Sequence, residues 1–348
     1  MNMPSVTIDA EVLAVTPNIA TNDDAHTYID TLLECRKLLD ESRFDIYMSE
    51  NASCTLFKDG LYPLRDHLKR LFEDSGIVEY DVNTVSQIVD SLLNLTPSFE
   101  KYFKIRDVLT DKLTTNPDIQ QLSSTVNLRS DLERCLVLVS ILRKCCRTPV
   151  LDHFVILRKA PKKSVSLRVF IHDLEHNRDD LSTLPTLPEV FEGEVLVCDN
   201  FHGLIDCLDE SAILLSSVDD VGLELAILIA LYKLRLTQGK EPDWDDDCGL
   251  LIGQKLHETI KESCADQASS FPTRVLRSIA ETLDGVNIAA VHALRTGPGG
   301  GDPQRVRGPD KAMRRDIDHE FHLHYWQCDD GSVEIASVVK HNDFSIPE

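Results

Sequence analysis

Four of the twelve histidines of this chain gather near its C-terminus, at positions His319, His322, His324 and His341. Histidine is the side chain that takes up or releases a proton near neutral pH, so neighbouring imidazoles can act as general acid and general base. Such a pair could cleave a phosphodiester without a metal, one imidazole taking the proton of a ribose 2′-hydroxyl and another protonating the leaving oxygen. Alternatively, the His-x-His pair could hold a metal ion, with Glu320 or Asp318 completing the ligand set.

The charged residues around these histidines extend the phosphodiester hypothesis. The candidate catalytic residues are His319, His322, His324, His341, Glu320, Lys340 and Arg315. Lys340 or Arg315 would neutralise negative charge on the phosphorane. In this hypothesis the site needs no resident metal and no cofactor.

A basic stretch precedes the histidines. From Arg295 to Arg315 there are six arginines and lysines against two aspartates. This stretch could follow the phosphate backbone of RNA or another nucleic acid, and a basic linker anchored to an acidic protein body is the alternative interpretation. The candidate substrate contacts are Arg305, Arg307, Arg314 and Trp326.

A β-hairpin is predicted to position the histidines. Residues 319–327 and 332–340 alternate between polar and apolar side chains, and Asp330-Gly331 between them is a strong turn signal. A turn centred there would place Trp326 opposite Glu334, His324 opposite Ala336 and His322 opposite Val338. Because side chains alternate across a strand, Glu320, His322, His324 and Lys340 would then share one surface. Phe321, Leu323, Tyr325, Ile335 and Val339 would form the core face.

A helical alternative exists for the same residues. If residues 311–326 formed a helix, Arg315, His319 and His322 would line one face of it. Arg315 and His322, with six residues between them, resemble the Arg-x(4–6)-His motif of the helical ribonucleases called HEPN domains. Asp316 after the arginine is a polar residue of the kind found there, and the resemblance covers eight residues.

The segment Thr296–Asp310 separates this module from the rest of the chain. It contains five glycines and three prolines in fifteen residues, a composition that excludes a helix or a sheet strand. We expect either a flexible linker or a loop folded over a ligand.

Most of the remaining sequence predicts helices. Apolar residues recur at helical spacing after Thr21–Asp24 and in the ranges 61–75, 83–94, 97–114, 126–146, 219–238, 250–265 and 272–294. Branched and aromatic residues predict strands at 153–159 and 165–172, paired as a hairpin, and at 194–198. Residues 1–20 are expected to be extended and only partly ordered.

These patterns predict a mainly α protein with a small mixed α/β central element and a C-terminal β-hairpin module, an α+β organisation. The expected parts are an N-terminal helical region (1–148), a mixed then helical region (149–295), the glycine and proline-rich segment (296–310) and the His-rich module (311–348).

Composition limits the classes of protein to which the chain can belong. Its net charge is −22, so any contact with a nucleic acid must come from a local basic patch or from a basic partner. Cys35, Cys135 and Cys198 lie in apolar runs and are expected to be buried free thiols in a reducing compartment. The N-terminus lacks the pattern of a signal peptide, and no apolar run is long enough to span a bilayer, so we expect a cytoplasmic protein without a membrane contact.

Two further acidic segments are potential cation sites. Asp245, Asp246 and Asp247 follow one another in a loop, and Asp173, Glu175 and His176 follow a predicted strand. The first lacks the spaced ligands and central glycine of a calcium loop, and a solvated loop is the favoured interpretation of each.

The sequence thus supports three hypotheses. The first is a metal-independent nuclease, with RNA as the favoured substrate, whose layout would suit an effector of a bacterial defence or toxin system. The second is a non-enzymatic subunit that docks a partner protein through the C-terminal hairpin. The third is a metal-binding module built on His322 and His324.

Overall fold

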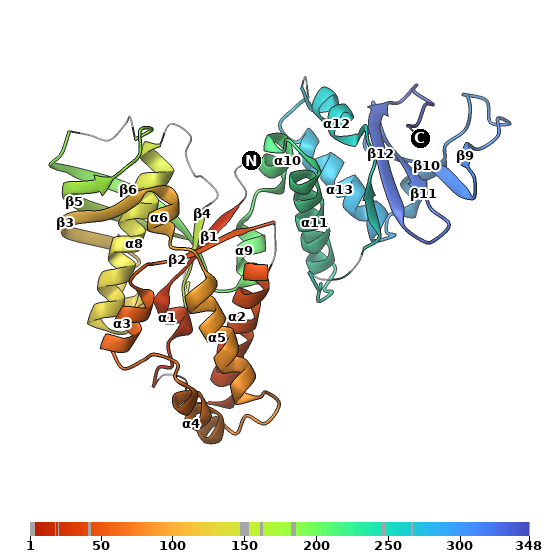
Figure 1. Ribbon diagram of the computed structural model, residues 1–348. Coiled ribbons are helices and arrows are strands. Elements are labelled where there is room, and N and C mark those ends of the chain that lie inside the picture. The colour runs from red at the N-terminus through yellow and green to blue at the C-terminus, as the bar shows by residue number, and fades with distance from the viewer. Residues whose placement is uncertain are drawn as a thin grey trace. The chain divides into compact units, whose positions relative to one another are not determined.

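The computed structural model describes residues 4–17, 19, 21–40, 43–146, 153–160, 163–181, 186–244, 246, 248–265 and 267–347. Contacts divide this chain between Cys207 and Leu208 into an N-terminal unit and a C-terminal unit. Each unit contains its own six-stranded mixed sheet (Figure 1). Helices account for 43% of the structure and strands for 25%. The predicted mainly helical fold with a small central element is therefore wrong.

The N-terminal sheet has the strand order β2-β1-β4-β6-β5-β3. Its four parallel strands are β1 (Ser5–Ile8), β2 (Asp45–Met48), β4 (His153–Ile156) and β6 (Glu189–Cys198). Strands β5 (Ser164–His176) and β3 (Ile105–Asn116) continue the sheet in antiparallel pairing. All residues of β1 and β4 are buried, as expected for parallel strands covered on both faces.

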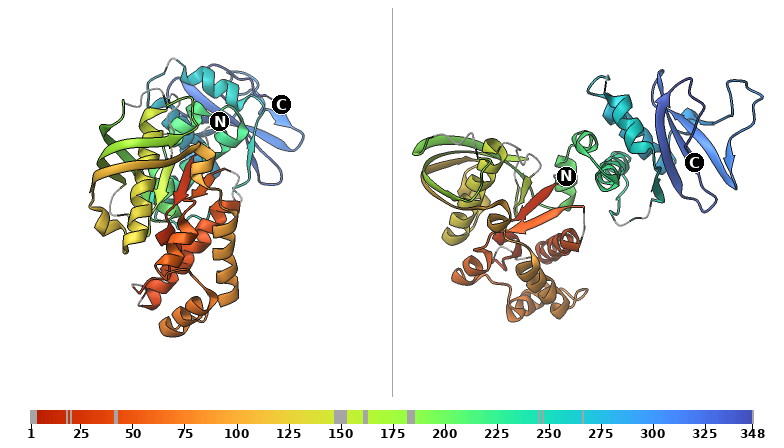
Figure 2. Two further views of the ribbon diagram at one scale, coloured as in Figure 1. Left: turned by 60° about the vertical axis from the view of Figure 1, so that its left-hand side comes forward. Right: turned by 45° about the horizontal axis from the view of Figure 1, so that its top comes forward.

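Helices cover this sheet on both faces. Val195 and Val197 of β6 belong to a buried cluster with α8 (Val126–Cys145), which lies against β3, β4 and β6 (Figures 1 and 2). Cys198, the next residue of β6, projects from the opposite face of the sheet. It lies near Cys35 of α2 (Asn22–Asp40) and Cys207 of α9 (Phe201–Cys207). The other helices of the unit are α1 (Ala10–Leu13), α3 (Ala52–Lys58), α4 (Arg65–Ser75), α5 (Val82–Leu95), α6 (Phe99–Phe103) and α7 (Ile119–Leu122).

Three expectations for the N-terminal unit are wrong. Residues 5–8 form the strand β1 at the middle of the parallel part of the sheet, rather than a partly ordered tail. The predicted helix 97–114 is the short helix α6 followed by the long strand β3. The predicted hairpin of β4 with β5 does not form, because β4 pairs with β1 and β6. In each case a pairing between residues far apart in sequence determines the structure.

Other expectations are confirmed. Helices α5 and α8 begin and end within one residue of the predicted ranges 83–94 and 126–146, and α2 begins at Asn22, where a helix was expected to follow Thr21–Asp24. Cys35, Cys135 and Cys198 are buried free thiols. The predicted boundary between the regions 1–148 and 149–295 lies outside the described residues, as do Asp245 and Asp247. None of the described helices has both the length and the apolar character needed to cross a membrane.

The C-terminal unit begins with the helices α10 (Glu210–Ser216) and α11 (Asp220–Thr237). Its sheet has the order β7-β12-β11-β10-β8, and β9 pairs with β10. The strands are β7 (Leu250–Ile252), β8 (Val291–Ala293), β9 (Val306–Arg307), β10 (Asp310–Asp316), β11 (Phe321–Gln327) and β12 (Val333–Lys340). The remaining helices are α12 (Leu256–Cys264), α13 (Phe271–Leu283) and the 3-10 turn η1 (Ile288–Ala290).

Helix α13 packs on one face of this sheet, which we call the helix face. The rings of Phe271 and Phe321 lie 4.8 Å apart there. The opposite face, which we call the open face, carries Ala312, Trp326 and Ala336, and these residues pack with Leu294. The predicted helices 250–265 and 272–294 each contain a strand at one end, β7 and β8. The short apolar runs there fit either period, and sheet pairing selects the strand.

The C-terminal hairpin is confirmed, and its register is partly wrong. Strands β11 and β12 pair through Trp326–Glu334 and Tyr325–Ile335 as predicted, and a β-bulge follows between His324 and Tyr325. The bulge moves all later pairs by one residue, so that His324 lies opposite Ser337, His322 opposite Val339 and Phe321 opposite Lys340. Gly331 has a φ of +93° in the turn, which favours glycine.

The helical alternative for residues 311–326 is wrong, because these residues form β10, a turn and β11. The resemblance of Arg315 and His322 to the HEPN motif is therefore not accompanied by a helix. Residues 296–303 form a loop that an isolated β-bridge between Arg295 and Gln304 closes. Contrary to expectation, the segment 296–310 also contains the short strand β9.

Candidate active site

A row of polar side chains crosses the open face of the C-terminal sheet. Arg314 of β10 pairs with His292 of β8 on one side and with His324 of β11 on the other. His324 in turn pairs with Ser337 of β12. Directly paired residues project from the same face, so these four side chains form one row across four strands.

Asp316 joins two histidines at the end of β10. Its Oδ1 lies 3.1 Å from Nε2 of His322, and its Oδ2 lies 3.6 Å from Nε2 of His292. The His322 side chain is 1% exposed, whereas those of His292 and Asp316 are 48% and 44% exposed. The carboxylate therefore connects a buried imidazole with one that solvent reaches.

The protonation state of His322 follows from its burial. Burial lowers the pKa of His322 to about 4, and the attraction of Asp316 offsets this effect only in part. His322 is thus neutral at neutral pH and donates its Nε2 proton to Asp316. Its ring lies 4.4 Å from the ring of His341, which is exposed just beyond the end of β12. The side chains of His292, Asp316, His322 and His341 consequently form a continuous chain.

A pocket of about 630 Å³ opens beside this chain of residues. It is lined by β8 with His292, by Arg314 and by residues that follow β12. The lining contains two guanidinium groups, that of the exposed Arg295 and that of the half-buried Arg314. It also contains the imidazoles of His292 and His341. The full lining consists of Val291, His292, Ala293, Arg295, Gly297, Pro298, Gly299, Gly300, Arg314, His341, Asn342 and Phe344.

The glycine-rich loop forms one wall of the pocket because Asp302 closes it. The Oδ2 atom of Asp302 accepts a hydrogen bond from the backbone N–H of Gly299 at 2.7 Å. A Cβ atom at Gly297 would lie 2.8 Å from the same oxygen, so a larger residue there would displace the carboxylate. Glycine is therefore required for the tight fold of this loop, and it leaves the backbone accessible to a ligand.

The C-terminal segment 344–347 covers the middle of the open face. The ring of His324 donates its Nδ1 proton to the carbonyl of Ser345 at 2.8 Å, and Nε1 of Trp326 donates to the carbonyl of Pro347 at 2.9 Å. Ile346 packs against the Trp326 cluster. His324 and Trp326 are consequently buried, and burial lowers the pKa of His324. The predictions that His324 is catalytic and that Trp326 contacts a substrate are therefore wrong, because neither side chain is accessible.

Several polar atoms remain unsatisfied beneath this cover. Four buried side-chain atoms have no hydrogen-bond partner within the described chain: Nδ1 of His322, Nε2 of His324, Nε of Arg314 and Oγ of Ser337. Buried polar groups normally have such partners. The interior of the open face can therefore accept further hydrogen bonds next to the pocket.

Arg315 and Arg307 have structural partners instead of the predicted roles. Arg315 lies on the helix face, is 1% exposed and contacts Glu281 of α13 at 3.0 Å. Arg307 bonds Glu334 at 2.7 Å and stacks on Trp326, with 4.7 Å to the ring centroid. Hydrogen bonds to Glu334 raise the pKa of Arg307. Neither residue lines the pocket.

The remaining predicted residues divide in the same way. His319 and Glu320 lie in the exposed turn between β10 and β11, and the bulge leaves Lys340 opposite Phe321 rather than on the face of His322. Arg305 is half-buried and approaches His324 electrostatically. Of the eleven predicted residues, the structure places Arg314 and His341 in the pocket lining and His322 directly behind them.

Sequence reasoning missed His292, Asp316 and Arg295. His292 lies within a range predicted as helical, and Asp316 lies at the end of β10, a strand that the sequence did not predict. Residues 310–316 show little alternation between polar and apolar side chains, because arginine occupies positions on both faces of the strand. Only Ala312 and Arg315 of this strand are buried. The spacing of these residues along the chain gives no sign of their convergence.

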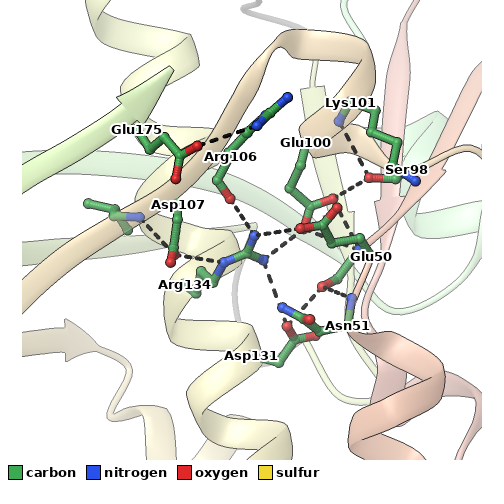
Figure 3. A network of polar contacts seen from close by, with 12 residues as sticks. Glu50, Asn51, Ser98, Glu100, Lys101, Arg106, Asp107, Asp131, Arg134 and Glu175 are labelled. Atoms are coloured by element: carbon green, nitrogen blue, oxygen red, sulfur yellow. Dashed lines mark hydrogen bonds and ion pairs between the residues drawn. The ribbon is translucent and has the colours of Figure 1, made fainter. Parts of the chain in front are cut away.

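A second polar cluster lies in the N-terminal unit (Figure 3). Arg134 of α8 donates to Glu100 of α6 at 2.7 Å and to Asp107 of β3 at 3.1 Å, and Asp131 lies 3.9 Å away. Burial would lower the pKa of Arg134, but the bonds to Glu100 and Asp107 outweigh this effect and raise it. The network connects α8, α6 and β3. We interpret it as a stabilising contact between these elements, because each acid has a partner within the protein.

The acidic, histidine and cysteine side chains of the described residues do not gather into a cation site. Within the described part of the chain, no group of three or more histidine, cysteine, aspartate or glutamate side chains is arranged to hold a metal ion. Comparison of the chain with protein-family models, with curated proteins and with solved structures found no match.

Proposed function

We propose that the C-terminal unit is a metal-independent ribonuclease whose active site is the pocket between β8, the glycine-rich loop and the end of β12. The observation that carries the proposal is the convergence of His292, His341, Arg295 and Arg314 on one pocket. Two imidazoles and two guanidinium groups are the set that general acid–base cleavage of a phosphodiester requires.

The proposed roles follow from the neighbours of each histidine. Oδ2 of Asp316 lies 3.6 Å from Nε2 of His292 and orients its ring at the mouth of the pocket, so we assign His292 as the general acid. His341 packs on the neutral ring of His322 and is the general base. His322 and Asp316 do not contact the substrate in this scheme and are positioning residues.

The reaction uses the ribose 2′-hydroxyl as the nucleophile. His341 accepts its proton, the 2′-oxygen forms a bond to phosphorus, and the bond from phosphorus to the 5′-oxygen breaks. His292 donates its proton to that leaving oxygen, which yields a 2′,3′-cyclic phosphate and a 5′-hydroxyl end. Arg295 and Arg314 neutralise the charge of the phosphorane. An internal nucleophile removes the need for a metal-bound hydroxide, which favours RNA over DNA.

The test is incubation of the purified chain with labelled single-stranded RNA, with and without EDTA. We expect cleavage that resists EDTA, ends in a cyclic phosphate and fails on an oligonucleotide carrying one 2′-deoxyribose at the scissile position. Each of His292→Ala and His341→Ala should lower the rate by about 10²-fold or more.

His319→Ala is the matched control, because His319 is an exposed histidine of the same unit outside the pocket. It should cleave like the wild type. Absence of cleavage by the folded protein, loss of cleavage in EDTA, or full activity of the His292→Ala variant would each contradict the proposal. Toxicity of the active chain in cells, absent for His292→Ala, would further support a role as an effector.

The docking alternative has less support in the geometry. The hairpin was expected to offer a free edge, but β12 pairs with β7 through Val333, Glu334 and Ile335, and β11 lies between β10 and β12. A partner strand at this edge would compete with β7. The metal-binding alternative would use His322 and His324, whose ring centroids are 6.3 Å apart, although Nδ1 of His324 is already bonded to Ser345.

A further inference from the structure

The N-terminal sheet contains a point at which the chain changes direction across the sheet. From β1 the chain continues to β2 on one side, whereas β4 lies on the other side of β1 and is followed in the sheet by β6. At such a point the segments after two neighbouring parallel strands diverge. The crevice that they leave at the carboxyl ends of the strands is where ligands bind in sheets of this type.

A pocket of about 280 Å³ lies at this position. Glu11 and Val12 line it from the segment after β1, and Arg158 and Lys159 from the segment after β4. Tyr28 of α2 and Ser123, between α7 and α8, are further lining residues. The pocket lies entirely within the N-terminal unit, and its residues take no part in the proposed ribonuclease site.

The two terminal nitrogens of the Arg158 guanidinium group differ in their hydrogen bonds. Its Nη1 donates to the carbonyls of Glu11 at 3.3 Å and Ala14 at 2.9 Å, and to Oγ1 of Thr16 at 3.1 Å. Its Nη2 is buried and has no hydrogen-bond partner within the described residues. A guanidinium group fixed in this way presents a preorganised donor to an oxyanion.

Ser123 supplies a second donor. The residue is 4% exposed, and its Oγ has no hydrogen-bond partner in the described part of the chain. Ser123 lies just before the twenty-residue helix α8, whose amino end favours negative charge. Nε of Arg129, in the first turns of that helix, is likewise buried without a partner among the described residues.

The two acids of the lining have bonds to the protein. Glu11 accepts a hydrogen bond from the N–H of Ser124 at 3.0 Å. Asp24 accepts from the N–H and the hydroxyl of Thr21. Nη2 of Arg158 and Oγ of Ser123 have no hydrogen-bond partner among the described residues, these two acids included, so both donors remain for a ligand.

We propose that this pocket binds a small organic phosphate monoester. Nη2 of Arg158, Oγ of Ser123 and the exposed ammonium of Lys159 contact the phosphate. Val12, Ile19 and Leu122, which also line the pocket, contact the organic part. Three donors of different kinds suit the three terminal oxygens of a phosphate monoester better than the two of a carboxylate.

The test is calorimetric titration of the full chain with ribose 5-phosphate and adenosine 5′-monophosphate. Ribose, adenosine and inorganic phosphate serve as comparisons. We expect at least one monoester to bind about tenfold or more tightly than both its dephosphorylated counterpart and inorganic phosphate. Lys159→Glu should weaken that binding about tenfold or more, and Ser123→Ala several-fold, without a change in the circular dichroism spectrum.

Two controls separate this site from the ribonuclease pocket. Lys112→Glu makes the same charge reversal at an exposed lysine outside the lining and should leave binding unchanged. Arg314→Ala removes a guanidinium group from the proposed ribonuclease pocket and should also leave it unchanged. The inference is overturned if neither monoester binds, if binding survives both Lys159→Glu and Ser123→Ala, or if Arg314→Ala abolishes it.

Discussion

His322 and His324 differ from His292 and His341 in burial rather than in chemical type. The first two are covered by the C-terminal segment or the sheet, and burial lowers the pKa of both. The latter two line the pocket. Only imidazoles that line the pocket can exchange a proton with a substrate, and Asp316 links one of them, His292, to the buried His322. Residue type therefore identifies the candidates, and exposure selects among them.

Burial of His153 has a consequence for the pH dependence of stability. His153 is buried between Ser5, whose Oγ lies 2.6 Å from Nδ1, and Thr7, whose Oγ1 lies 2.8 Å from Nε2. Burial lowers its pKa to about 3, whereas histidine in an unfolded chain titrates near 6.5. Between these values the unfolded state binds a proton that the folded state does not, so stability falls as pH falls from about 6.5 towards 3.

We therefore expect His153→Gln to change the pH slope of the unfolding free energy. Between pH 4.5 and 6 the wild-type slope should exceed the variant slope by about 1.4 kcal/mol per pH unit, the equivalent of one proton. Urea titrations of both proteins across this range measure the difference. Equal slopes would show that His153 is protonated in the folded state.

At the scale of elements, the C-terminal segment and the β-bulge determine the chemistry of the open face. The bulge between His324 and Tyr325 places Ser337 rather than Ala336 opposite His324. The segment 344–347 is attached through the bonds of His324 and Trp326 to its carbonyls and through Ile346. A hairpin alone would expose the histidines, and these neighbouring elements bury them.

Ile346→Asp should release this segment, because it places a charge in the Trp326 cluster. We expect a destabilisation of about 1–3 kcal/mol, together with exposure of Trp326 and His324. Quenching of tryptophan fluorescence by acrylamide and modification of histidines by diethyl pyrocarbonate report these two changes. Ser345→Ala keeps the backbone carbonyl that His324 uses and removes only the exposed hydroxyl that donates to Asp343, so quenching and histidine modification should stay at the wild-type level. Unchanged quenching in the Ile346→Asp variant would show that the segment does not depend on this contact.

At the scale of the whole molecule, the net charge of −22 opposes the approach of a polyanion. The basic stretch reduces this repulsion only locally, because Arg307 and Arg315 are paired with Glu334 and Glu281. Arg295 and Arg314 remain at the pocket. The proposed ribonuclease thus engages few phosphates of its substrate.

A shallow salt dependence of RNA cleavage follows from this count. With about two phosphate contacts to a single strand, the logarithm of kcat/KM should fall with the logarithm of salt concentration with a slope of about −1.4. Measurement from 50 to 300 mM potassium chloride tests this, with Arg314→Ala expected to make the slope shallower by about 0.7. A slope steeper than about −4 would require an extended binding surface.

The sequence by itself predicted the elements that depend on neighbouring residues. Alternation and the Asp330-Gly331 turn predicted the C-terminal hairpin, and helical spacing predicted α2, α5 and α8, because such signals arise within one to three turns of chain. The same reasoning brought forward Arg314, His322 and His341 as site residues. The buried free thiols followed from their apolar neighbours.

The tertiary structure alone decided which strands pair and which side chains meet. Strand β1 was expected to be a partly ordered tail and β3 and β8 were expected to be helical, because their short apolar runs fit either period and only distant partners make them strands. His292 and His341 are far apart along the chain and line one pocket because the sheet order brings β8, β10 and the end of β12 together. The physical reason is that pairing energy and burial come from contacts distant in sequence, which local periodicity does not record.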